Sequence, residues 1–138
     1  MKEGFSLIDS LKIHSDFQEM PKVETLVDQI CNRIGVNEDF YGNVLIAVTE
    51  AVNNAIEHGN QNKGELLVSL GVGEAPTEFC FSVKDEGAGF DYENLPDPTA
   101  PENIMKENGR GIFLMKNLAD DLIFENGGNE VSIYFSKQ

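Results

Sequence analysis

A helical pattern at residues 38–58 constrains the fold of this chain more than any other feature of its sequence. Its apolar residues recur at helical spacing and form one stripe, so one face of this helix must pack against a core. The stripe consists of Val44, Leu45, Val48, Val52, Ala55 and Ile56. The opposite flank carries Glu50, Asn54 and Glu57. This flank is either a plain solvated surface on a helix that Gly59 caps, or part of a functional site.

Two segments with paired glycines follow this helix. Asp85-Glu86-Gly87-Ala88-Gly89-Phe90-Asp91 comes directly after a strand-like run, and Gly109-Arg110-Gly111-Ile112-Phe113-Leu114-Met115 opens an apolar helical run. Either segment alone can be a simple turn, because glycine adopts positive φ and lets another backbone approach closely. An acidic helix with an amide, an Asp-x-Gly-x-Gly and a Gly-x-Gly before a helix are together a much rarer combination.

The helix flank at residues 50–59, the Asp85 segment and the Gly109 segment are called here the first, second and third boxes. In these three boxes the chain resembles the GHKL nucleotide-binding superfamily, which includes gyrase, Hsp90, histidine kinases and MutL. Within it, Glu-Ala-Val-x-Asn-Ala-x-x-His-Gly at residues 50–59 and Gly-Arg-Gly-Ile-Phe-Leu-Met at residues 109–115 are similar to the small anti-sigma-factor serine kinases of bacterial sporulation and general-stress control. The resemblance covers nearly the whole chain.

The resemblance implies an α/β fold, the two-layer α/β sandwich called the Bergerat fold, as one ATP-binding domain over residues 1–138. Periodicity predicts the same layers, namely a mixed, mainly antiparallel sheet with three helices on one face. The expected strands are residues 5–14, 65–73, 77–85, 122–126 and 130–136, and the expected helices are residues 22–34, 38–58 and 111–119. The side chains expected to point inward include Leu7, Leu11 and Ile13 in the first strand and Phe113, Leu114 and Leu118 in the last helix.

Residues 92–108 have no clear periodicity and carry three of the five prolines. An irregular segment of this length inside a small domain is usually a functional lid or a disordered loop. The resemblance implies that it is the ATP lid.

The ligand that the resemblance implies is ATP with Mg²⁺, and the family places the metal on the asparagine that is Asn54 here. The chain has no Gly-x-x-x-x-Gly-Lys-[Ser/Thr] loop to bring a lysine to the phosphates, so a bound Mg²⁺ must neutralise their charge. Glu50 lies one helical turn before Asn54, where a carboxylate can polarise a hydroxyl or water that approaches the terminal phosphate. Glu50 is therefore the predicted general base.

Further nucleotide contacts are expected at the end of this helix and in the loop after the second hairpin strand. Glu57 and His58 continue the same edge, although His58 can equally be a C-terminal histidine that the helix dipole favours. Asp85 is the expected adenine reader, because a carboxylate can accept a hydrogen bond from the exocyclic amino group of adenine, and guanine has no amino group at that position. Gly87 and Gly89 would let the base lie against bare backbone.

The third box supplies the predicted phosphate contacts. Gly109 and Gly111 free amide hydrogens at the start of a helix, where anionic oxygens are favoured. Ile112 and Phe113 complete the box. Arg110 can pair with phosphate, face a partner, or be an ordinary surface arginine, and its role stays open.

Two features depart from the superfamily pattern. Many members have Gly-Thr in the closing hairpin at the adenine pocket, whereas Gly128 is followed here by Asn129. No phospho-acceptor histidine on a long dimerisation helix precedes the domain, so the chain should phosphorylate another protein or nothing.

Composition limits the partners. The 24 acidic and 10 basic residues give a formal net charge of −14, which opposes binding to nucleic acid or to anionic membrane surfaces. No run of 18 apolar residues and no apolar signal core occur, so we expect a cytoplasmic protein. Cys31 and Cys80 are expected to be buried thiols, without a zinc site or a disulfide.

These observations lead to three hypotheses. The first is an anti-sigma factor that binds a sigma factor and phosphorylates a serine of a STAS-type antagonist. The second is a non-catalytic switch in which ATP orders the lid and so controls protein binding. The third is the catalytic module of a two-component sensor. A homodimer is compatible with each of them.

Overall fold

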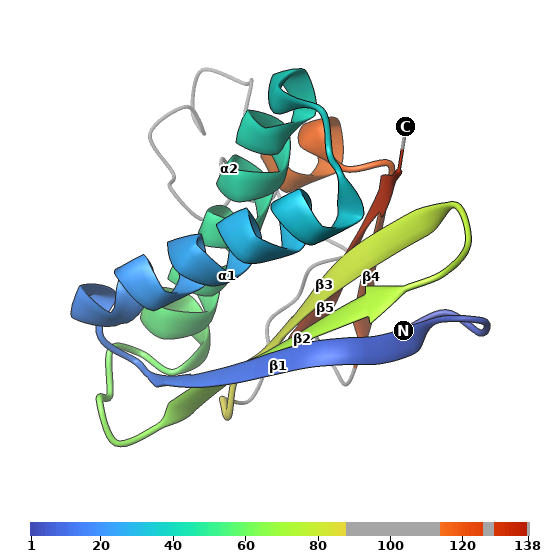
Figure 1. Ribbon diagram of the computed structural model, residues 1–138. Coiled ribbons are helices and arrows are strands. Elements are labelled where there is room, and N and C mark those ends of the chain that lie inside the picture. The colour runs from blue at the N-terminus through green and yellow to red at the C-terminus, as the bar shows by residue number, and fades with distance from the viewer. Residues whose placement is uncertain (88–113, 126–128, 138) are drawn as a thin grey trace, which may run out of the picture.

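The computed structural model describes residues 1–87, 114–125 and 129–137, and it has a sheet layer and a helix layer (Figure 1). The elements are β1 (Ser6–His14), a 3-10 turn (Phe17–Glu19), α1 (Met20–Ile34), α2 (Glu38–Asn54), a π-helical turn (Ala55–Gly59), β2 (Leu67–Glu74), β3 (Glu78–Lys84), β4 (Asp121–Glu125) and β5 (Glu130–Ser136). Residues 114–118 are helical as well.

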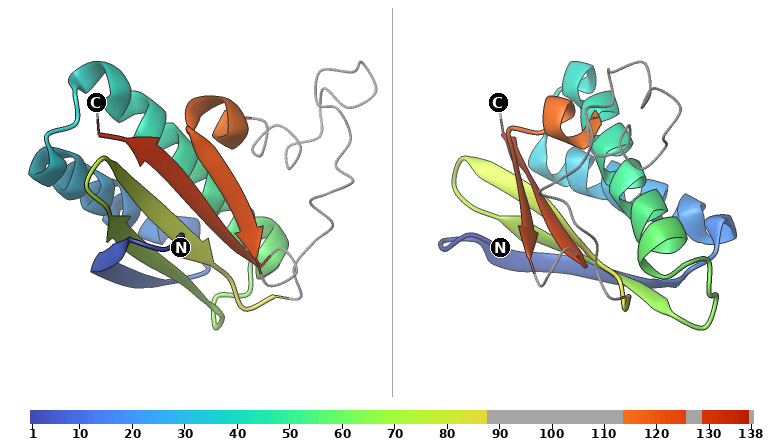
Figure 2. Two further views of the ribbon diagram at one scale, coloured as in Figure 1. Left: turned by 90° about the vertical axis from the view of Figure 1, so that its right-hand side faces the viewer. Right: turned by 180° about the vertical axis from the view of Figure 1, so that it is seen from behind.

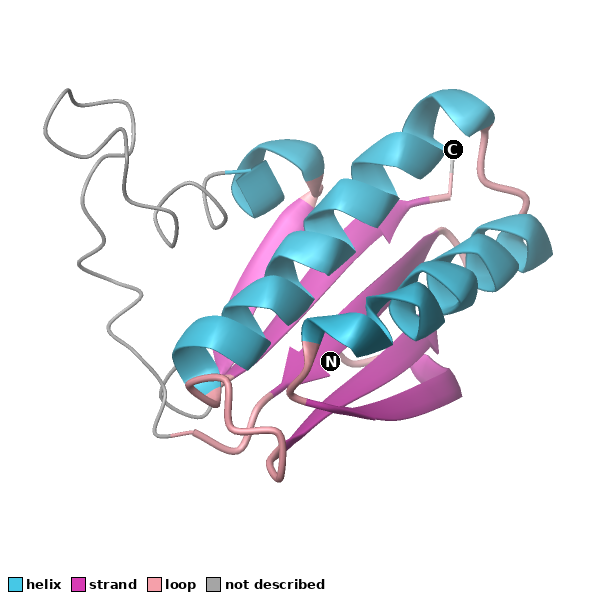
Figure 3. Cartoon of the chain, turned by 90° about the vertical axis from the view of Figure 1, so that its left-hand side faces the viewer, coloured by secondary structure: helices cyan, strands magenta, loops and turns pink. Residues whose placement is uncertain are grey.

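The five strands form one sheet in the order β1-β2-β3-β5-β4, and each neighbouring pair is antiparallel. The described strands therefore contain no parallel pair, because the β2–β3 and β4–β5 hairpins join through an antiparallel β3–β5 pairing. Figures 2 and 3 show α1, α2 and the helix at residues 114–118 on the same face of the sheet. The predicted two-layer α/β sandwich with a mainly antiparallel sheet and helices on one face is confirmed.

Local sequence signals explain where the two long helices begin and end. Pro21 lies in the first turn of α1, where its missing N–H costs no hydrogen bond, and Gly35 ends the helix in the left-handed conformation with φ of 83°. The Asn37 side chain caps α2 by accepting a hydrogen bond from the Asp39 amide at 2.9 Å.

The core lies between the helices and the inner face of the sheet. Alternate residues of β2, β3 and β5 point into it and meet the apolar stripes of α1 and α2. The central strands contribute Val68, Leu70, Val72, Phe79, Phe81, Val83, Val131, Ile133 and Phe135. The rings of Phe79 and Phe135 stack with centroids 5.4 Å apart. This packing fixes the α2 helix over the sheet.

The predicted inner face of the first strand is wrong at Leu7, which is 66% exposed. The β1–β2 register shifts between Leu7 and Asp9, so the strand contains a β-bulge. A bulge adds one residue to one strand and reverses which face the following side chains occupy. Ile13 is therefore buried while Leu7 points to the opposite face.

Alanine substitutions in this strand should show the difference. Ile13→Ala should lower the free energy of unfolding by about 2–5 kcal/mol because it leaves a cavity in the core. Leu7→Ala should change it by no more than about 0.5 kcal/mol, as at most surface positions. Urea denaturation of both variants measures this, and equal losses would show that Leu7 packs in the core.

The short helix at residues 114–118 also has a different inner face from the predicted one. Met115 is 1% exposed, whereas Leu114 is 38% exposed. Leu118 is partly buried against the core as predicted. Phe113 lies outside the described residues.

Candidate functional site

The helix that carries Glu50 and Asn54 ends differently from the prediction of a continuous α-helix through His58. The α-helix ends at Asn54, and Ala55–Gly59 form a π-helical turn. The Asn60 amide donates to the Ala55 carbonyl at 2.8 Å, five residues earlier in the chain. π-Helical turns are rare in proteins, and those that occur are often found at functional sites.

Gly59 is needed at this turn for a close approach to Asp85. Its φ is not in the left-handed region, so it does not act as the predicted glycine cap. A Cβ at this position would lie 2.2 Å from Asp85 Oδ2, and a Cβ at Gly87 would lie 1.9 Å from the Gly59 carbonyl oxygen. The missing side chains let the end of α2 and the loop after β3 pack backbone to backbone. The structure thereby brings the first two predicted boxes together.

Asp85 is a buried carboxylate held from two sides. Its amide donates to the Asn129 carbonyl at 2.9 Å, and its Oδ1 accepts a hydrogen bond from the Gly87 amide at 2.8 Å. The residue is 7% exposed. Burial raises the pKa of the Asp85 carboxyl, and the hydrogen bond from Gly87 opposes this rise only in part.

Such a carboxylate is costly for the fold. No lysine or arginine of the described residues forms an ion pair with Asp85. A buried charge that lacks an opposite charge destabilises the folded state, and perturbed groups of this kind are concentrated at functional sites. Asp85 is therefore the residue of the second box whose position most strongly indicates a ligand.

The Asp85→Asn substitution should stabilise the ligand-free protein at neutral pH. Because the folded pKa lies above the ordinary value of 3.8, ionised Asp85 opposes folding, and this cost disappears as the pH falls through the folded pKa. The gain in unfolding free energy of the variant over the wild type should therefore be present at pH 7 and shrink towards pH 4. Urea denaturation across this range measures it, and a gain that grows on acidification would contradict it.

Asn54 has a side-chain amide group that no described residue binds. Its residue is half-buried, and its Nδ2 is shielded from solvent and lacks a hydrogen-bond partner in the part of the chain that the structure describes. An unpaired amide costs stability, so a ligand that engages this side chain would compensate for it. Its carbonyl oxygen and the carboxylates of Glu50 and Glu57, one turn to either side, are the hard oxygen ligands that Mg²⁺ prefers.

The other predicted residues at this end of α2 differ in exposure. Glu50 and Glu57 are half-buried, whereas His58 is exposed. Asp85 and Gly87 lie beside the same helix end through Gly59. Across residues 1–87, 114–125 and 129–137, no group of three or more His, Cys, Asp or Glu side chains could hold a metal by itself. The residues present fit a Mg²⁺ that shares its coordination with phosphate oxygens and water.

The remaining predicted contacts lie outside the described residues. These are Gly89, Gly109, Arg110, Gly111, Ile112 and Phe113, together with the lid at residues 92–108. Their roles stay predictions.

Asn129, which replaces the threonine of many superfamily members, does lie at the site. Its backbone carbonyl accepts from Asp85, and its Oδ1 is buried with no hydrogen-bond partner among the described residues. The sequence alone left the contact of this residue open, because only the strand register places it next to Asp85.

Asn60 is not among the site residues predicted from the sequence. Its side chain is 1% exposed and forms three hydrogen bonds, one of them to the loop that carries Asp85. A polar residue directly after the helix end was the available signal, but its partners are distant in sequence.

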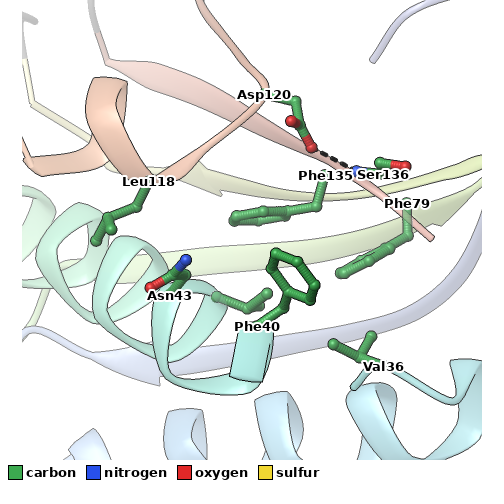
Figure 4. Close-up of a pocket in the computed structure, with 9 residues that line it drawn as sticks. Val36, Phe40, Asn43, Phe79, Leu118, Asp120, Phe135 and Ser136 are labelled. Carbon is green, nitrogen blue, oxygen red and sulfur yellow. Dashed lines mark hydrogen bonds between the residues drawn. The ribbon is translucent and has the colours of Figure 1, made fainter. Parts of the chain in front are cut away.

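A cavity of about 210 Å³ lies at the other end of α2 (Figure 4). The rings of Phe40, Phe79 and Phe135 line it, and Asp120 accepts a hydrogen bond from the Ser136 amide at its rim. The described residues around it include none of the predicted site residues. This cavity is separate from the site at Asp85.

Both cysteines are buried free thiols, as predicted. Burial, with a smaller effect from Asp28, raises the pKa of Cys31 to about 11, which keeps this thiol protonated at neutral pH. Within the described segments, no helix is long and apolar enough to cross a membrane.

The model of the histidine kinase-like ATPase domain family matches residues 13–135. The serine-protein kinases RsbW of Bacillus cereus (strain AH820) and Bacillus thuringiensis (strain Al Hakam) are each 28% identical to this chain over 162 aligned positions, covering 99% of both chains.

A solved structure of the RsbU and RsbW domains of a Mycobacterium tuberculosis protein shares the fold, with a TM-score of 0.57 and 15% sequence identity. That match covers 94% of this chain and 32% of the longer chain. The family match covers most of the chain and includes the helix and the loop that meet at Asp85. The protein is thus a member of the histidine kinase-like ATPase domain family.

Proposed function

We propose that this chain is a single-domain, ATP-dependent serine protein kinase that acts as an anti-sigma factor in the cytoplasm. Its substrate is a STAS-type antagonist, and its second partner is a sigma factor that it releases when the antagonist binds. The observation that carries the proposal is the buried Asp85 carboxylate, which forms no ion pair with a described lysine or arginine and packs against the end of the helix that bears Glu50 and Asn54. The full-length likeness to RsbW serine-protein kinases supports the choice of reaction and partners.

In this proposal, the buried carboxylate selects the base. Asp85 accepts the exocyclic amino hydrogen of adenine, while a 6-oxo group would place a second acceptor against it. Its low exposure excludes water and makes an unmatched acceptor costly. The base therefore binds at the loop after β3, and the phosphates extend towards the helix flank of Glu50 and Asn54.

The helix flank carries the chemistry of the phosphates. Asn54, with phosphate oxygens and water, would hold Mg²⁺, which supplies positive charge to the phosphates when it is bound. Glu50 accepts the proton of the attacking serine hydroxyl as that oxygen approaches the terminal phosphate. The third box, at residues 109–113, donates backbone amides to the phosphate oxygens.

Nucleotide selectivity can be tested by thermal unfolding. Magnesium-ATP or magnesium-ADP at 100 times its dissociation constant should stabilise the fold by about 2.7 kcal/mol. GTP at the same concentration should give little or no shift, because Asp85 faces an oxo group instead of an amino group. Equal shifts for ATP and GTP would remove Asp85 as the base reader.

Phosphoryl transfer requires a separate experiment. The pure chain is incubated with radiolabelled ATP and STAS-domain proteins from the same organism, and label on a serine of one of them is the expected result. Binding of ATP without transfer to any of them would favour the non-catalytic switch. Transfer of label to a histidine in place of a serine would favour a two-component sensor.

A further inference from the structure

Asn60 forms a buried junction between three segments that are distant in sequence. Its Nδ2 donates to Ser15 Oγ at 2.7 Å and to the Leu67 carbonyl at 3.0 Å. Its Oδ1 accepts a hydrogen bond from the Glu86 amide at 2.8 Å. The segments joined are the end of β1, the start of β2 and the loop after β3. A buried amide with this many partners holds them in one arrangement.

Glu86 adds a second tie between the same loop and the same strand. Its Oε2 accepts a hydrogen bond from the Leu67 amide at 2.7 Å. Both backbone groups of Leu67 are thus bound, the carbonyl by Asn60 and the amide by Glu86. Because Leu67 is the first residue of β2, this anchor is part of the sheet.

These hydrogen bonds hold Glu86, the residue directly after Asp85. The backbone of the loop is held at Asp85 by the Asn129 carbonyl and at Glu86 by the Asn60 side chain. Gly59, directly before Asn60, packs against the Asp85 carboxylate. The described side-chain hydrogen bonds of Asn60 and Glu86 go to Ser15, Leu67 and each other and not to the Asp85 carboxylate, so we expect them to influence a ligand there through the position of Asp85.

We propose that Asn60 and Glu86 are positioning residues that fix the Asp85 carboxylate and thereby set the preference for a 6-aminopurine over a 6-oxopurine nucleotide. The inference rests on the proposed function, in which Asp85 reads the base. A fixed carboxylate cannot move away from a 6-oxo group, so the mismatch keeps its full cost. A loosened loop relieves the mismatch, and selectivity then falls more than affinity for ATP.

Calorimetry with ATP and inosine triphosphate, which has an oxo group in place of the amino group, measures this preference directly. The wild type should prefer ATP by about 10²-fold or more. Asn60→Ala and Glu86→Ala should each reduce the ratio of the two dissociation constants at least about 10-fold. Glu86 is exposed, so its variant should fold even where loss of the buried Asn60 prevents folding.

Two variants serve as controls. Ser15→Ala removes one Asn60 partner but leaves the bonds of Asn60 to Leu67 and Glu86, so the ratio should stay at the wild-type value. Val27→Ala opens a cavity in the core at α1, and Val27 takes no part in the hydrogen bonds of this junction, so the variant should lose stability and keep the ratio unchanged.

The possible outcomes distinguish a failure of this inference from a failure of the proposed function on which it rests. A wild type that binds both nucleotides equally would overturn the role of Asp85 in base recognition. A selective wild type whose ratio survives in Glu86→Ala, and in Asn60→Ala where that variant folds, would overturn the positioning role alone. An equal loss in Ser15→Ala or Val27→Ala would also overturn it, because general loosening would then explain the effect.

Discussion

Asn54→Ala should weaken binding of magnesium-ATP on the order of 10²-fold or more. Mutation of a residue that only hydrogen-bonds to a metal ligand typically lowers metal affinity about 10–100-fold. Asn54 is proposed as a direct ligand, so its loss should have at least this effect. The fold should survive, because the substitution removes a buried Nδ2 that has no hydrogen-bond partner among the described residues. Calorimetry gives the affinity, and urea denaturation without nucleotide gives the stability.

The neighbouring asparagine provides a matched control. Asn53 is half-buried on the same helix, but its side chain projects from a different face of the helix than Glu50 and Asn54. Asn53→Ala should therefore leave the affinity for magnesium-ATP within a few-fold of the wild type. The binding of ADP in the presence of a chelator should be the same in the wild type and in Asn54→Ala. An equal loss of affinity without the metal would show that Asn54 contacts the nucleotide itself.

Much of the fold follows from the periodicity of the sequence. The apolar stripes of α1 and α2 and the alternation in β2, β3 and β5 predict buried residues that the structure confirms. Leu7 shows the limit of this reasoning. A β-bulge adds one residue without changing the composition of the strand, so nothing in the local sequence reveals that the face has changed.

The candidate site depends on contacts that local patterns do not contain. Gly59 has the sequence of a helix cap, yet its role is to let the Asp85 carboxylate approach, 26 positions later in the chain. Asn60 looks like a turn residue, yet its partners Ser15 and Glu86 are 45 and 26 positions away. The resemblance to the superfamily predicted that the boxes meet, and the sheet topology shows how residues 59 and 85 do so.

The free-energy cost of burying the Asp85 carboxylate connects the stability of this chain with its proposed function. Without a ligand, the buried Asp85 carboxylate destabilises the fold, and so does the Asn54 Nδ2, which has no hydrogen-bond partner among the described residues. A magnesium nucleotide that engages both groups would remove these costs together. The two substitutions Asp85→Asn and Asn54→Ala should therefore lose ligand binding while the ligand-free protein keeps or gains stability.

Glu50→Gln should separate nucleotide binding from phosphoryl transfer. Glutamine keeps the size and the hydrogen-bonding capacity of glutamate but lacks the carboxylate that accepts the serine proton. The affinity for magnesium-ATP should stay within a few-fold of the wild type, while the rate of transfer to the STAS-type antagonist should fall about 10²–10⁴-fold. Calorimetry and single-turnover incorporation of radiolabelled phosphate measure the two effects on the same preparations.

The matched control removes the same charge from a different helix. Glu24 is exposed on α1, so Glu24→Gln should leave both affinity and transfer at wild-type values. Because the Glu50 variant still binds ATP, it should hold its sigma factor when the antagonist is absent. When the antagonist is added, the variant cannot inactivate it by phosphorylation, so the two should stay bound and the sigma factor should stay released. Transfer at the wild-type rate in Glu50→Gln would remove this residue from the mechanism and leave proton acceptance to solvent or to the substrate.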